Sequence, residues 1–130
     1  MTYCLDTDHA IEYLRDNPKV TAQVIAHQHE ILLTPITLME LFYGAYRSNQ
    51  SEKRVLQVQE FLAFLSVLPF SLKVYQEFGK IKASLATQGN IVDNFDLLIA
   101  CFCKVHDCIL VTNNTKHFSR FPEVKRENWI

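Results

Sequence analysis

The stretch TYCLDTD at residues 2–8 decides the fold. A short apolar run at residues 3–5 leads directly into the polar residues 6–8, which is typical of a buried strand that ends at a capped helix. Two further apolar runs, ILLT at residues 31–34 and ILVT at residues 109–112, have the same length and character. Because helical patterns separate these runs, the sequence predicts a parallel sheet covered by helices on both faces.

Apolar periodicity and capping residues predict the other elements. Thr37 followed by Glu40 forms a capping-box pattern, and Gly89 is expected to stop a long helix. The expected strands cover residues 2–5, 31–34, 67–70 and 109–112. A first helix is expected to end near residue 17, and five more to cover residues 20–27, 37–46, 51–65, 71–87 and 93–105. We therefore expect a single α/β domain over residues 1–130, with a central, mainly parallel sheet.

The composition limits the possible functions. The chain has 130 residues, 48% of them hydrophobic, which suffices for one core and excludes a disordered chain. Its formal net charge of −1 excludes a strongly basic nucleic-acid clamp, so binding to a polyanion requires a local patch. The four cysteines match no metal or redox spacing, and no stretch of about 20 apolar residues is present. We expect a cytoplasmic protein with reduced thiols and no membrane contact.

Three carboxylates lie in segments that otherwise have core character. Asp6 follows the first apolar strand, Glu40 interrupts the run LMELF, and Asp96 interrupts the run FDLLIA. A buried carboxylate must be paired, neutralised or bound to a metal, and no arginine stands near these three in the sequence. Asn114 follows another buried strand, so four oxygen donors would converge at one sheet edge. Such a cluster selects a hard cation, Mg²⁺ or Mn²⁺.

Each acid also has a simpler structural interpretation. Glu40 would be the capping-box acid of Thr37, Asp6 would cap the helix that follows it, and Asp96 would be stabilised by the dipole of its own helix. These interpretations stay open for each residue taken alone. The four residues together favour the metal site.

The motifs of the chain, in their order and spacing, resemble the PIN-domain family and, more closely, the VapC toxins of toxin–antitoxin pairs. The matching motifs are LDTD at residues 5–8, ITLMELFYGA at 36–45, DLLIA at 96–100, VTNN at 111–114 and ENW at 127–129. The resemblance covers the whole chain and implies a PIN-like three-layer α/β/α sandwich. The third and fourth motifs carry Asp96 and Asn114, which the acidic cluster had already indicated.

The resemblance implies a Mg²⁺-dependent endoribonuclease that hydrolyses a phosphodiester in structured RNA. Asp6, Glu40 and Asp96 would bind the metal, and Asn114 would stand where the family often has a fourth acid or amide. The motif at residues 36–45 is most similar to the subgroup that cuts initiator tRNA in the anticodon region. The family also implies a homodimer and a VapB-like antitoxin whose carboxyl-terminal segment lies across the acidic groove. Our hypothesis is that a basic side chain of the antitoxin pairs with the carboxylates.

One residue departs from the family pattern beside the first acid. Asp8 stands where the family usually has Asn or Ser, so it adds a negative charge that would alter the affinity for metal. None of the four site residues is replaced.

Basic residues in the last quarter of the chain are candidates for contacts with RNA phosphates. Lys104, Lys116 and Arg120 are the three that we single out, and the alternative is a solvated charged face. The RNA would be a tRNA or a ribosomal RNA.

Two other functions compete with a nuclease. Asp6 and Asp8 resemble the paired aspartates of haloacid-dehalogenase-like phosphatases, although Ala10 stands where that pattern usually has Thr or Val. A binding module for RNA or for an antitoxin, without catalysis, is the other alternative.

Overall fold

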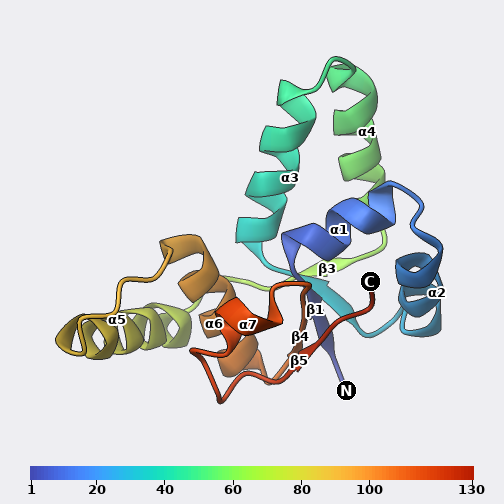
Figure 1. Cartoon of the computed structure of the whole chain (residues 1–130). Helices are drawn as coiled ribbons and strands as arrows, with labels where there is room; N and C mark the ends of the chain where they lie inside the picture. The colour runs from blue at the N-terminus through green and yellow to red at the C-terminus, as the bar shows by residue number, and fades with distance from the viewer.

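A parallel five-stranded sheet lies between two layers of helices in the computed structural model, which describes residues 1–130 (Figure 1). The strands are β1 (Tyr3–Leu5), β2 (Ile31–Leu33), β3 (Ser66–Val67), β4 (Ile109–Val111) and β5 (Arg126–Glu127), in the spatial order β3-β2-β1-β4-β5. The helices are α1 (Thr7–Leu14), α2 (Pro18–Ala26), α3 (Pro35–Arg47), α4 (Ser51–Leu62), α5 (Leu72–Thr87), α6 (Asn94–His106) and α7 (Thr115–Phe118). The predicted α/β sandwich with a parallel sheet is confirmed.

Successive strand residues point to opposite faces of the sheet and thereby define two cores. Tyr3 and Leu5 of β1 pack with residues of α1, α2, α3 and α4, whereas Cys4 packs with residues of α5, α6 and α7. The strand β4 repeats this alternation, with Leu110 on the side of Cys4. Helices α1 to α4 therefore cover one face, and α5 to α7 cover the other (Figure 1).

The middle strands are buried on both faces, which explains why they are apolar without alternation. All residues of β1 and β4 are buried, and the helix α6 that packs on them buries six of its residues. None of the seven helices is long and apolar enough to cross a membrane.

Several local predictions are wrong. Helix α3 starts at Pro35, and the side chain of Thr34 caps it by accepting a hydrogen bond from the backbone N–H of Thr37 at 3.1 Å. Thr37 is therefore in the first turn, so the predicted capping box with Glu40 does not form. Helix α4 ends at Leu62 rather than at residue 65, and the tail contains β5 and α7, which the sequence did not predict.

The topology brings one end of the sheet together with the starts of two helices. β1 lies next to β4 in parallel, so Leu5 and Val111 are partners and the residues that follow them meet at the carboxyl edge. Helix α1 begins directly after β1, and α7 follows β4 after a short loop. The predicted site residues Asp6 and Asn114 are placed at this edge.

Candidate active site

Asp6 is held rigidly at the end of β1. Its side chain is the N-cap of α1, where Oδ1 accepts a hydrogen bond from the Thr7 N–H at 2.8 Å, and Oδ2 accepts one from the Thr112 hydroxyl at 2.7 Å. Asp6 is 8% exposed and forms no ion pair with a lysine or arginine. Burial raises the pKa of Asp6 to about 6. The negative charges of Asp8 and Asp96 also raise this pKa, whereas the two hydrogen bonds lower it.

Glu40 reaches the same edge from α3. It is half-buried, and its Oε1 accepts a hydrogen bond from the hydroxyl of Thr7 at 2.6 Å. Because Thr7 also donates its backbone N–H to Asp6, this one residue positions two of the three predicted acids. The hydrogen bond to Thr7 replaces the capping interaction that the sequence suggested for Glu40.

Asp96 lies in the first turn of α6, whose N-cap is Asp93. The Asp93 side chain accepts hydrogen bonds from the backbone N–H groups of Phe95 and Asp96, at 2.9 and 3.2 Å. The Asp96 side chain is 29% exposed, and its Oδ2 lies 2.8 Å from Nε2 of His117. Burial raises the pKa of Asp96, and a protonated His117 would oppose the rise.

His117 is the residue at this site that sequence reasoning missed. It lies on α7, a single turn of helix that starts directly after Asn114. Its closeness to Asn114 in the sequence was the one signal that could have placed it at the site. The predicted strand pattern stopped at residue 112, and the helix was too short to give a periodic pattern.

Asn114 is tied to the site through its backbone. Its N–H donates to the Thr112 hydroxyl at 3.0 Å, and the same hydroxyl donates to Asp6. The Asn114 side chain is exposed and makes no capping bond to α7.

The predicted acids thus meet at one edge of the sheet without any lysine or arginine to neutralise them, and the charge of Asp96 contributes to the pKa of Asp6. A cation would remove this repulsion, so the residues fit a divalent metal. No three acidic, histidine or cysteine side chains are close enough to form a closed cage. A divalent cation bound at this edge would therefore take part of its coordination from water or from phosphate.

The three predicted RNA contacts differ in their surroundings. Lys104 lies in the last turn of α6 and pairs with Glu77 at 2.9 Å and with Glu123 at 3.5 Å, so its charge is compensated. Lys116 is exposed on α7 next to His117, and it forms no ion pair. Arg120 is exposed and donates to the carbonyl of Ile91 at 3.3 Å.

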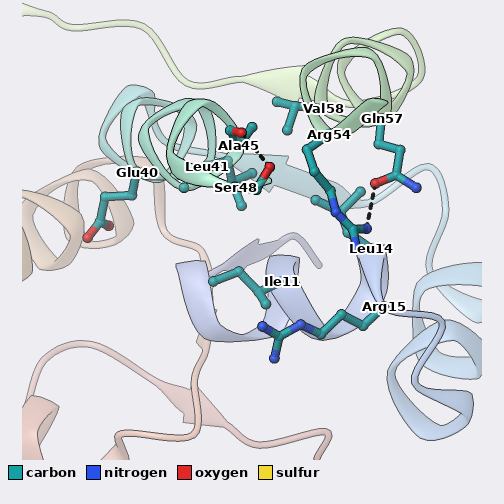
Figure 2. A pocket seen from close by; sticks show the side chains of 11 residues that line it. Ile11, Leu14, Arg15, Glu40, Leu41, Ala45, Ser48, Arg54, Gln57 and Val58 are labelled. Atoms are coloured by element: carbon teal, nitrogen blue, oxygen red, sulfur yellow. Dashed lines mark hydrogen bonds between the residues drawn. The ribbon is translucent and has the colours of Figure 1, made fainter. Parts of the chain in front are cut away.

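A groove of about 310 Å³ begins at Glu40 and runs between α1, α3 and α4 (Figure 2). Its apolar lining includes Ile11, Leu14, Leu41 and Val58. Figure 2 shows Glu40 at one edge of the groove with its carboxylate turned away from the other labelled side chains, the guanidinium group of Arg54 beside Leu14, and that of Arg15 below Ile11. The groove therefore has an apolar floor, two arginine side chains along it and an acid at one edge.

The chain is similar to known proteins over its full length. Residues 3–124 match the family described as "PIN domain". Ribonuclease VapC2 of Haemophilus influenzae is 31% identical over 131 residues, covering 100% of this chain and 99% of the relative. The tRNA(fMet)-specific endonuclease VapC of Shigella flexneri is 32% identical, covering 99% of this chain and 98% of the relative.

The solved structures agree. The crystal structure of DNA-bound VapBC from Salmonella typhimurium superposes with a TM-score of 0.92 at 30% identity, covering 100% of this chain and 99% of that one. VapBC2 from Rickettsia felis, bound to a DNA fragment from its promoter, superposes with a TM-score of 0.90 at 32% identity over 100% of both chains. A haloacid-dehalogenase-like phosphatase is thereby excluded. The chain belongs to the PIN domain family and is a member of its VapC branch.

Proposed function

We propose that this VapC-type endoribonuclease toxin uses Mg²⁺ and cuts initiator tRNA in the anticodon region. The observation that carries the proposal is the edge formed by Asp6, Glu40 and Asp96, where partly or wholly buried carboxylates have no lysine or arginine partner. The substrate proposal is supported by the similarity to the tRNA(fMet)-specific endonuclease. Since tRNA is a cytoplasmic molecule, we place the activity in the cytoplasm.

The residues at the edge would divide the work of hydrolysis. When bound, the divalent cation would screen the phosphate charge, activate water and stabilise the leaving oxygen. Asp6 and Asp96 would hold the cation directly. Asp6 is suited to this because Thr7 and Thr112 fix both of its oxygens.

Glu40 and Asn114 would have supporting roles. Thr7 fixes Oε1 of Glu40, which leaves the other carboxylate oxygen to bind the cation or to orient a water. Asn114 would orient a water or the substrate with its exposed side chain.

The RNA would approach across α7. Lys116 is exposed in the same short helix as His117, so it would meet a phosphate close to the acids, and Arg120 follows two residues after the helix. We leave Lys104 out of this surface because Glu77 and Glu123 already compensate its charge.

A VapB-like antitoxin would occupy the groove in Figure 2. Its apolar side chains would cover Leu14 and Val58, an acidic side chain would meet Arg15 or Arg54, and a basic side chain would meet Glu40. If an arginine or lysine of the antitoxin pairs with Glu40, its replacement by Ala should weaken the inhibition of the nuclease. Unchanged inhibition would refute the pairing.

Exposed aromatic side chains support a homodimer. Met39, Tyr43 and Tyr46 lie at helical spacing on α3, and Tyr43 and Tyr46 are 63% and 68% exposed. Sedimentation equilibrium would test the dimer, and Tyr43→Glu should shift it toward the monomer.

Cleavage of purified initiator tRNA, with Mg²⁺ or with a chelator, tests the proposed function. Asp6→Asn and Asp96→Asn should abolish a discrete, Mg²⁺-dependent band, whereas Asp107→Asn should not, because Asp107 is exposed at the opposite end of α6. No cleavage of initiator tRNA together with cleavage of ribosomal RNA would refute the substrate. Metal and RNA binding without cleavage of any RNA would indicate a non-catalytic module.

A further inference from the structure

A fully buried histidine links the two ends of the chain. The backbone N–H of Trp129 donates to Nε2 of His9 at 3.0 Å, and Nδ1 of His9 lies 2.8 Å from Oδ1 of Asp8. A backbone N–H only donates, so Nε2 carries no proton. The proton is therefore on Nδ1, which donates to the carboxylate of Asp8. The partners of the ring thus assign a single tautomer to His9.

Asp8 extends this chain of hydrogen bonds to the active-site loop. Its Oδ2 accepts the backbone N–H of Asn113 at 3.0 Å. The side chain of Asn128 donates to Oδ1 of Asn113 at 3.1 Å, which closes a ring back to Trp129. Asn113 lies between β4 and α7 and directly precedes Asn114.

The carboxyl-terminal end of the ring is firmly anchored. Trp129 is 7% exposed, its indole ring stacks on His27 at 5.7 Å, and its indole N–H donates to Glu127 at 3.2 Å. Tyr3 of β1 packs against the same indole ring at 5.4 Å. A residue next to the end of the chain is thus fixed against the first strand.

We propose that Asp8 and His9 are positioning residues, which transmit the anchoring of Trp129 to the loop that carries Asn114 and to α7. This inference rests on the proposed function, since it assigns the loop to the active site. Asp8 acts here through its hydrogen bonds, and neither a metal contact nor its added negative charge is its main contribution.

The direction of the hydrogen bonds suits an acid at position 8 of this chain, where His9 follows it. Both oxygens of Asp8 accept, one from His9 and one from Asn113. An asparagine that accepts from Asn113 would present its NH₂ group to Nδ1 of His9. Nδ1 would then have to accept, the ring proton would move to Nε2, and that proton would face the N–H of Trp129. Asp8→Asn therefore breaks the chain of bonds at one point or the other.

Two variants separate this role from the effect of charge. Asp8→Asn removes the charge and reverses one donor. His9→Gln keeps the charge of Asp8 and offers Trp129 an amide oxygen, but it removes the donor to Asp8. The matched controls are Asp107→Asn and His29→Gln, because both residues are exposed and neither contacts the ring.

The kinetic test measures cleavage of an initiator tRNA transcript. We expect both variants to lower kcat by about 10- to 100-fold, the range typical of residues that orient a metal site, with KM little changed because no substrate contact is lost. The controls should match the wild type. A loss in Asp8→Asn alone would show an effect of charge only, and no loss in either variant would show that the ring does not support the site. Both results overturn the proposal.

A second test does not depend on nuclease activity. ¹⁵N NMR of the wild-type histidines should show His9 protonated on Nδ1, and His9→Gln should shift the amide signals of residues 112–117. A proton on Nε2, or unchanged amide signals, would overturn the proposal. If the wild-type chain binds Mn²⁺ but cuts no tRNA, the proposed function fails, while the NMR result still decides the ring of hydrogen bonds.

Discussion

Asp6→Asn should make the metal-free protein more stable at neutral pH while it abolishes RNA cleavage. The pKa of Asp6 is raised from 3.8 to about 6, chiefly by burial. The unfolded chain therefore releases this proton at a lower pH than the folded chain does. Between pH 4 and pH 6 the unfolded state binds fewer protons, so the free energy of unfolding falls as the pH rises.

The raised pKa sets the size of the effect. The free energy of unfolding of the wild type falls by about 1.4 kcal/mol for each pH unit between the two pKa values of Asp6. It therefore falls by about 3 kcal/mol from pH 4 to pH 6. Asparagine resembles the protonated acid in size and carries no charge at any pH. The variant should therefore match the wild type near pH 4 and exceed its stability by about 3 kcal/mol at pH 7.5.

Urea unfolding in a chelator, followed by the fluorescence of the buried Trp129, measures this difference at several pH values. Burial raises the pKa of Asp96 in both proteins, so the difference between them reports on Asp6 together with its electrostatic coupling to Asp96. Added Mg²⁺ should stabilise the wild type and not the variant, since only the wild type retains the ligand. Equal pH dependence in both proteins would refute the idea that Asp6 is a buried carboxylate without a cationic partner.

Three further predictions concern the core, a helix cap and the RNA surface. Phe102→Ala should lower the free energy of unfolding by about 3 to 5 kcal/mol, because this ring is fully buried under the sheet; urea titration measures it, and a loss under 1 kcal/mol would contradict the packing. Thr34→Ala should cost about 1 kcal/mol and Thr34→Ser much less in the same titration, since only the hydroxyl caps α3; equal losses would contradict the cap. Lys116→Ala should weaken tRNA binding and lower the salt slope by about one in a filter-binding assay, whereas Lys104→Ala should leave both unchanged; the reverse order would show that α7 does not face the RNA.

The sequence predicted the elements with strong patterns and missed those without one. The strands at the centre of the sheet and the helix α6 were predictable because they are long or wholly apolar. The two-residue strand β5 and the one-turn helix α7 have no periodicity, so tertiary contacts alone define them. The local capping-box pattern predicts Thr37 as the cap of α3, whereas the structure has Thr34 as the cap, directly before Pro35 at the first helical position.

The site was predictable where a charge interrupted an apolar segment. Asp6, Glu40 and Asp96 carried that signal, and the structure brings them to one edge of the sheet. His9 and His117 gave no such signal, because each lies beside other polar residues in the sequence. The contact of His9 with Trp129 joins residues more than 100 positions apart, and that of His117 with Asp96 joins residues 21 positions apart. No local sequence pattern indicates such pairs.

The position of β4 and β5 has a consequence for the synthesis of the chain. β4 pairs directly with β1, and the Thr112 hydroxyl that holds Asp6 follows β4, so residues made last complete a site begun by residues made first. A nascent chain still attached to its ribosome before residue 109 has neither this pairing nor α7. The edge that holds Asp6 therefore cannot be completed before β4 and Thr112 have been synthesised.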